Sequence, residues 1–110
     1  GINSFLATKV LWFNQFKDLI DRYDSRYSVV ANAVGYDKRI GNGHTKVPGF
    51  DGKKGFGGSC FPKDTAAIAN FASGSLTVLE EVMEANNLYR SQYMLDEREK
   101  EQNVSFNSTI

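Results

Sequence analysis

Residues 55–64 read Gly-Phe-Gly-Gly-Ser-Cys-Phe-Pro-Lys-Asp, and this stretch marks the change from a glycine-rich loop to a helix. Glycine lets a backbone approach a ligand closely and adopt positive φ. Pro62 suits the first turn of a helix, and Asp64 places a carboxylate near the positive end of that helix. We therefore predict that a loop ends at Cys60 and that a helix follows it to about Ala72, where a Ser-Gly-Ser sequence breaks it.

The loop before this helix concentrates the glycines of the chain. Eight of the ten glycines lie in residues 35–58, and this segment has the periodicity of neither a helix nor a strand. A loop of this length in a compact domain is usually functional or disordered. Residues 35–64 also carry six basic and three acidic side chains, so an anionic ligand is expected here.

Helical periodicity covers the N-terminal third of the chain. Residues 3–23 contain no glycine or proline, and apolar residues recur at helical spacing in two stripes. These stripes leave a narrow polar face that includes Asn14. Ser25 is a candidate N-cap for a second, shorter helix, which is predicted to end at Gly35.

A longer helix is predicted for the C-terminal part of the chain. An apolar stripe at helical spacing runs through residues 76–99, and residues 102–110 are predicted to form a flexible tail. The predicted fold class is all-α: a small domain of about four helices over residues 1–101, with one long glycine-rich loop and a long C-terminal helix.

Length and composition exclude several classes of protein. The 110 residues give room for one ordinary domain, and 41% of them are hydrophobic, as in globular proteins. Thirteen basic residues balance thirteen acidic ones, so no nucleic-acid partner is expected. No apolar run is long enough to span a membrane, so no membrane partner is expected either. The single cysteine fits a reducing compartment, and a cytoplasmic location is predicted.

Cys60 is the candidate nucleophile. Free amides at a helix N-terminus bind anions and favour a thiolate, although most free cysteines are small buried hydrophobes. The chain has no nucleotide-binding fingerprint, because Gly52-Lys53 is followed by Lys54 and no G-x-G-x-x-G is present. His44 has no second histidine or cysteine at ligand spacing, so no metal site is expected.

The stretch of residues 55–64 resembles the catalytic-cysteine motif of the UDP-glucose/GDP-mannose dehydrogenases. Asn3-Ser4-Phe5-Leu6-Ala7-Thr8 looks like the start of a helix in that family, NAFLA. Gly35-Tyr36-Asp37-Lys38-Arg39-Ile40-Gly41 looks like its G-x-D-x-R-I-G turn. These three motifs occur in the order of the family's central helical domain.

The resemblance implies an NAD-dependent enzyme that oxidises the C6 alcohol of a nucleotide sugar to a carboxylate, as from UDP-glucose to UDP-glucuronate. Cys60 would be the nucleophile that carries a thiohemiacetal and then a thioester. Asp64 would place and activate the water, and Asn3 would hydrogen-bond substrate and water. The resemblance further implies a set of substrate-binding residues, of which the arginine would reach the substrate from a partner subunit: Arg39, Phe56, Gly57, Gly58, Ser59 and Phe61.

The resemblance also implies parts that these 110 residues do not contain. Neither a Rossmann domain for NAD nor a C-terminal nucleotide-binding domain is present, so no residue here is assigned to the cofactor. The family's catalytic lysine would fall two residues before Gly1. We therefore expect the isolated chain to be inactive, and we expect a homodimer through the helix predicted over 76–99. His44, Lys53 and Lys54 are candidates to face the diphosphate of the substrate.

Two further readings of the sequence belong to other classes of function. The first is a non-catalytic helical module that serves as a dimeric scaffold, which the missing lysine favours. The second is a free-standing binder of anions or sugar nucleotides that uses the basic segment 35–64. The sequence does not identify the nucleotide sugar.

Overall fold

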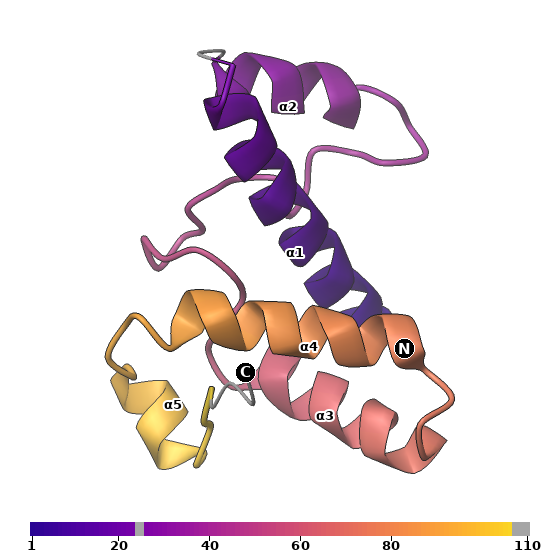
Figure 1. The fold of residues 1–110 in the computed structure, drawn as a ribbon, viewed down its shortest axis with the longest axis vertical. Coiled ribbons are helices and arrows are strands. Elements are labelled where there is room, and N and C mark those ends of the chain that lie inside the picture. The colour runs from indigo at the N-terminus through magenta and orange to yellow at the C-terminus, as the bar shows by residue number, and fades with distance from the viewer. Residues whose placement is uncertain (24–25, 107–110) are drawn as a thin grey trace.

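The computed structural model describes residues 1–23 and 26–106, and Figure 1 shows its arrangement. The prediction of an all-α fold is confirmed, because the described residues contain helices and no strand. The proposed N-cap Ser25 lies outside the described residues. There are five helices in this part of the chain: α1 (Ile2–Asp21), α2 (Tyr27–Gly35), α3 (Cys60–Ala72), α4 (Thr77–Arg90) and α5 (Glu97–Glu101).

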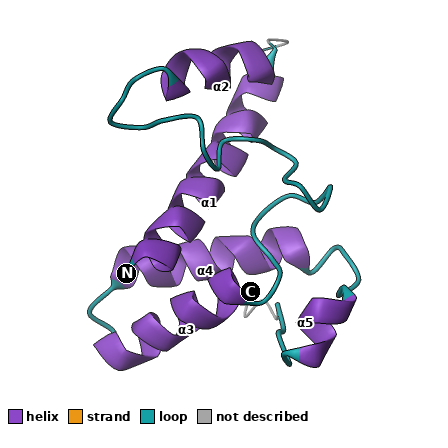
Figure 2. Cartoon of the chain, turned by 180° about the vertical axis from the view of Figure 1, so that it is seen from behind, coloured by secondary structure: helices purple, strands orange, loops and turns teal. Residues whose placement is uncertain are grey.

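Helix α1 is the element on which the others are arranged. It packs against α2 near its C-terminal end and against α3 and α4 near its N-terminal end (Figure 1). The long loop between α2 and α3 returns along α1, as the view from behind shows (Figure 2). The loop therefore carries the chain from the α2 end of the molecule to the first residue of α3.

Two apolar clusters form the core. Near α2, the aromatic ring of Phe13 packs with Tyr27, Ala31 and Val47. Phe16 adds edge-to-face contacts with both rings in this cluster, at centroid distances of 6.3 and 6.5 Å. The second cluster lies where α1 meets the end of the loop, and its buried members are Ala7, Leu11 and Phe56.

The single helix predicted over 76–99 is wrong, because the structure divides that segment into α4 and α5. The chain turns after Arg90, and Asp96 begins α5 with a capping box. In that box the Asp96 side chain accepts from the Glu99 amide at 2.8 Å, and the Glu99 side chain accepts from the Asp96 amide at 2.9 Å. The turn brings the Glu99 carboxylate back to the loop before Cys60, where it accepts a hydrogen bond from the Gly58 amide.

The predicted tail over 102–110 is partly packed. Val104 and Phe106 are buried, with 8% and 7% of their surface exposed. The Gln102 side chain accepts a hydrogen bond of 2.7 Å from Lys63 Nζ of α3. Residues 102–106 therefore lie against the domain, and residues 107–110 of the predicted tail lie outside the described residues.

Among residues 1–23 and 26–106, no helix is long and apolar enough to cross a membrane.

Candidate active site around Cys60

Cys60 is the first residue of α3, as the sequence predicts. Its side chain is exposed, and its sulfur lies 4.0 Å from Ser59 Oγ. The first amides of a helix have no partner within the helix and stabilise negative charge at that end. This position leaves the Cys60 sulfur accessible to solvent at the end of the helix where the unpaired amides lie.

Two other expected catalytic residues meet beside the first turn of α3. The Asn3 side chain donates a hydrogen bond of 2.7 Å from Nδ2 to Asp64 Oδ2. Asn3 lies at the start of α1, so this bond joins two helix N-termini. Asp64 follows Cys60 by four residues, and such a pair shares one face of a helix. The structure thus brings Asn3 and Asp64 into contact, one helical turn after Cys60.

Buried asparagines hold the backbone of the loop before Cys60. Asn14 Oδ1 accepts from the Gly55 amide at 2.8 Å. Asn86 Oδ1 accepts from the Phe56 amide at 2.7 Å, while its Nδ2 donates to the Phe56 carbonyl at 3.0 Å. The sequence places Asn14 on a polar face, but the structure buries it under the loop. A buried asparagine that bonds to backbone gives no periodic signal, so sequence reasoning missed this role.

A buried charged group lies beneath the same loop. Arg90 donates from Nη1 to Asp51 Oδ2 at 2.8 Å and from Nη2 to the Gly55 carbonyl at 3.0 Å. Burial alone would raise the pKa of Asp51, but its bonds to Arg90 and to the Lys53 amide, with both positive charges, outweigh burial and lower that pKa. Arg90 and Lys53 therefore hold the Asp51 carboxylate ionised.

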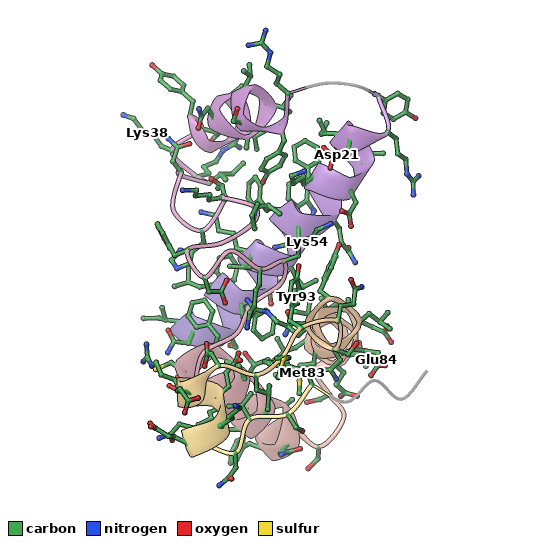
Figure 3. All side chains as sticks on the ribbon, turned by 90° about the vertical axis from the view of Figure 1, so that its left-hand side faces the viewer. Asp21, Lys38, Lys54, Met83, Glu84 and Tyr93 are labelled. Carbon is green, nitrogen blue, oxygen red and sulfur yellow. The ribbon has the colours of Figure 1, made fainter. Side chains whose placement is uncertain are left out.

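Lys53 contacts the segment between α4 and α5, whereas Lys54 contacts α1 and α4. Lys53 Nζ donates to the Met94 carbonyl at 2.9 Å. Lys54 forms an ion pair with Asp18 and lies over the ring of Tyr89, 5.1 Å from its centroid. The Lys54 amide also donates a hydrogen bond of 3.3 Å to the Tyr93 hydroxyl. Figure 3 shows Lys54 and Tyr93 close to each other. These contacts fasten the loop to α1 and α4, so they do not support a role facing a diphosphate.

The same contacts shift the ionisation of the helix residues. Burial tends to raise the pKa of Asp18, but hydrogen bonds from Lys54 and Tyr89 and nearby lysine charges lower it overall. Burial and the Asp18 carboxylate raise the pKa of Tyr89 above its ordinary value. Asp18 is thus held ionised and Tyr89 protonated, which preserves their hydrogen bond.

An open groove of about 940 Å³ lies beside the loop. Gly57, Gly58, Phe56 and Phe61 line it, so four of the expected substrate-binding residues border one space. Ser59 is not among the lining residues. His44 also lines the groove, and its ring lies 5.7 Å from that of Phe61. Phe61 follows Cys60 directly, so the groove reaches the first turn of α3.

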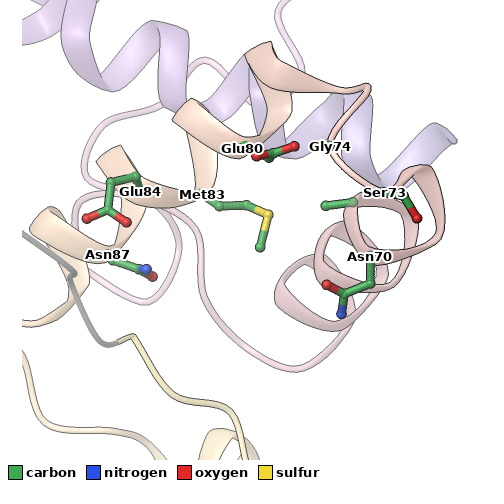
Figure 4. Close-up of a pocket in the computed structure, with 8 residues that line it drawn as sticks. Asn70, Ser73, Gly74, Glu80, Met83, Glu84 and Asn87 are labelled. Atoms are coloured by element: carbon green, nitrogen blue, oxygen red, sulfur yellow. The ribbon is translucent and has the colours of Figure 1, made fainter.

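A smaller pocket of about 340 Å³ lies between α3 and α4 and contains none of the expected catalytic residues. Figure 4 shows Met83 of α4 extending toward Asn70 and Ser73 at the end of α3. This pocket is therefore separate from the candidate active site.

Arg39 is not brought to Cys60 within the same chain. Its guanidinium is 89% exposed and forms two hydrogen bonds to Asp37, of 3.0 and 2.7 Å. The turn that carries it follows α2, at the opposite end of the molecule from α3 (Figure 1). Within its own chain, Arg39 is therefore paired with Asp37 and not with a residue of the candidate active site.

The described residues do not fit a dinucleotide cofactor. The backbone that cradles a pyrophosphate in dinucleotide-binding folds lies between a strand and a helix. The loop before α3 follows a helix, and no strand occurs in the described part of the chain. Within residues 1–23 and 26–106 there is also no group of three histidine, cysteine or acidic side chains that could hold a metal ion.

Comparison with known proteins places this arrangement in a family. The model of the UDP-glucose/GDP-mannose dehydrogenase family, central domain, matches residues 2–88. The chain belongs to this dehydrogenase family. The match confirms the resemblance seen in the three sequence motifs, and it includes Asn3, Cys60 and Asp64.

Similar proteins with established names support the same assignment. UDP-glucose 6-dehydrogenase TuaD of Bacillus subtilis (strain 168) is 41% identical over 91 residues, which cover 80% of this chain and 19% of that protein. UDP-glucose 6-dehydrogenase of Rickettsia prowazekii (strain Madrid E) is 36% identical over 89 residues, 78% of this chain and 19% of that protein. UDP-glucose 6-dehydrogenase YwqF of Bacillus subtilis (strain 168) is 38% identical over 88 residues, 77% of this chain and 19% of that protein. The chain therefore spans about a fifth of the length of these relatives.

Proposed function

We propose that this chain is the central, cysteine-bearing part of an NAD-dependent nucleotide-sugar 6-dehydrogenase that converts UDP-glucose to UDP-glucuronate. The observation that carries the proposal is the position of Cys60 at the N-terminus of α3, beside the hydrogen-bonded Asn3–Asp64 pair. A nucleophile on a helix N-terminus and a carboxylate one turn later are the two groups that thioester formation and hydrolysis require.

The chemistry assigned to this chain begins at the sulfur. The Cys60 thiolate adds to the carbonyl carbon of a C6 aldehyde, which forms a thiohemiacetal after its oxygen takes a proton. Conversion to the thioester removes the C6 hydrogen as a hydride, for which NAD would be the acceptor bound outside the described residues, while the hydroxyl of the thiohemiacetal loses its proton to solvent. A water then attacks the thioester carbon and loses a proton to Asp64, while the C–S bond breaks and the thiolate leaves. Asn3 orients the Asp64 carboxylate for this step.

The groove provides the place for the sugar nucleotide. Gly57, Gly58 and Phe61 line it directly before and after Cys60, and Ser59 completes the backbone between them. We assign Arg39 to a partner subunit's site, because in its own chain its exposed side chain follows α2 and pairs with Asp37, away from the residues around Cys60. The domain over 1–101 would form a homodimer through α4 in the cytoplasm.

The exposed apolar side chains of α1 favour a second candidate, the helical scaffold. Four large apolar side chains of this helix are at least 44% exposed: Ile2, Phe5, Trp12 and Leu19. A scaffold needs such a surface for assembly and has no need of a reactive cysteine. The two candidates therefore differ in what they require of Cys60.

The aldehyde form of UDP-glucose, oxidised at C6, tests the proposed function on the chain itself. Addition of the Cys60 sulfur to the aldehyde removes the free thiolate, so the aldehyde is expected to slow iodoacetamide alkylation of Cys60. UDP-glucose with its intact alcohol is the matched control and cannot add to the thiol. Equal alkylation with both compounds would overturn the catalytic assignment and favour the scaffold.

A second measurement concerns hydride transfer to NAD. The purified 110-residue chain is expected to form no NADH when mixed with UDP-glucose and NAD, because a hydride transfer needs a positioned nicotinamide. Measurable NADH formation that depends on Cys60 would contradict this expectation.

A further inference from the structure

Glu99 has a carboxylate that is almost completely buried. The side chain is 1% exposed, and each oxygen has its own backbone partner. Oε1 accepts from the Asp96 amide at 2.9 Å, and Oε2 accepts from the Gly58 amide at 2.9 Å. A buried charge is unfavourable unless it is paired and hydrogen-bonded. Glu99 meets both conditions only while α5 lies against the loop.

The positive partner of Glu99 holds the same loop from a second side. Arg90 Nη1 lies 3.8 Å from Glu99 Oε2, and the Arg90 side chain is 3% exposed. The same guanidinium binds Asp51 and the Gly55 carbonyl. The pair therefore contacts the loop at three points, and the last of these, Gly58, stands two residues before Cys60.

Two glycines of the loop lie where Arg90 and Glu99 meet the backbone. A Cβ on Gly57 would collide with the Arg90 guanidinium and the Glu99 carboxylate. Gly58 has a φ of 75°, in the region that residues with a side chain rarely adopt. The absence of a side chain at Gly57 lets two buried charges pack directly beneath the backbone, while glycine at position 58 permits the positive φ.

We propose that Glu99 is a positioning residue for the nucleophile: with Arg90, it clamps the Gly57–Gly58 backbone and thereby fixes Cys60 at the N-terminus of α3. Both clamp residues lie beyond residues 2–88, which match the family's central domain. The segment after α4 thus takes part in the active site by folding back as α5. This inference rests on the proposed role of Cys60 as nucleophile.

The amide of Gly58 reports the clamp directly. In Glu99→Ala its hydrogen exchange is expected to accelerate by at least about tenfold, because its acceptor is lost. Exchange in α1 should change much less. Glu99→Gln serves if the alanine variant does not fold, since an amide has one acceptor oxygen where the carboxylate uses two. Unchanged protection at Gly58, or an equal loss throughout the chain, would overturn the proposal.

Two single glycine variants test the effect on Cys60 without changing any charge. Gly57→Ala is expected to expose the Gly58 amide. It is also expected to slow alkylation of Cys60 by iodoacetamide at least about threefold, because the sulfur is no longer held in one place at the helix end. Gly43→Ala is the control in the same loop, where an added Cβ meets nothing within 4 Å. Equal alkylation in the two variants would overturn the positioning role. An unreactive Cys60 in the unmodified chain would instead remove the proposed function, and the Gly58 exchange would still report the clamp.

Discussion

The α2 end of the molecule and the loop before Cys60 are stabilised by different interactions. At the α2 end, aromatic and aliphatic side chains fill a buried cluster around Phe13. Around the loop, the ring of Phe56 packs in the second apolar cluster, while polar side chains hydrogen-bond the backbone of Phe56 and of its neighbours. Those polar side chains are Asn14, Asn86, Arg90 and Glu99.

The difference shows how two kinds of packing serve two purposes. An apolar cluster tolerates a change of shape if its volume is kept, because its contacts have no direction. A buried polar group requires a partner at a defined distance and angle. The first arrangement stabilises the fold, and the second fixes the course of the backbone that leads to Cys60.

The largest expected effect concerns the apolar cluster. Phe13→Ala is expected to lower the free energy of unfolding by about 3–5 kcal/mol, because it removes a buried ring and leaves a cavity. Phe13 is 2% exposed, whereas Phe5 of the same helix is 70% exposed. Phe5→Ala is therefore the control, with an expected change within about 0.5 kcal/mol. Urea unfolding measures both, and equal losses would contradict the assignment of the core.

Asn86 tests the polar arrangement, with a slightly smaller effect. Asn86→Leu keeps the size of the side chain but leaves the amide and carbonyl of Phe56 without their partners. We expect a loss of about 2–4 kcal/mol in urea unfolding, since each buried unsatisfied group costs about 1–3 kcal/mol. Phe13→Leu should lose less than about 1.5 kcal/mol, as a swap between apolar residues. If Asn86→Leu were as mild as Phe13→Leu, the two regions would not differ as described.

Asp51 gives the smallest effect and a dependence on pH. Its folded pKa lies below the ordinary value, so its contribution to stability is present above about pH 4 and is lost as the pH falls through the folded pKa. Because the side chain is one third exposed, Asp51→Asn should cost only about 1 kcal/mol at pH 7. The difference in Tm between the two proteins should narrow below pH 4. A constant difference from pH 7 to pH 3 would contradict the role of the charge.

Local signals in the sequence were sufficient for the first three helices. Gly35 ends α2, Pro62 lies in the first turn of α3, and Ser73-Gly74 follows its last residue, as predicted. Each of these residues restricts or permits a backbone conformation by itself, independent of distant contacts. The start of α3 at Cys60 could be predicted for the same reason.

The break between α4 and α5 was missed because the deciding contact is distant in sequence. Residues 91–96 contain no glycine or proline, and the apolar spacing continues across them. The Asp96-x-x-Glu99 pattern of a capping box was the one local signal. The bond from Gly58 to Glu99 spans 41 positions, and no periodicity encodes it.

The candidate site was predicted in identity more than in geometry. The resemblance named Asn3, Cys60 and Asp64, and the structure brings Asn3 and Asp64 into hydrogen-bonding contact. The sequence did not indicate that Lys54 pairs with Asp18, because charge composition shows where basic residues are concentrated but not which groups they contact. Such partners depend on which helix packs beneath the loop.

The reactivity of Cys60 in the intact chain tests the central claim most directly. The second-order rate of iodoacetamide alkylation is measured at pH 7 for the folded chain and for the same chain in urea. We expect Cys60 to react roughly tenfold faster in the folded chain, because the fold presents its exposed sulfur beside the unpaired amides of the first turn of α3. A folded chain in which Cys60 reacts no faster than in urea would contradict its assignment as the nucleophile.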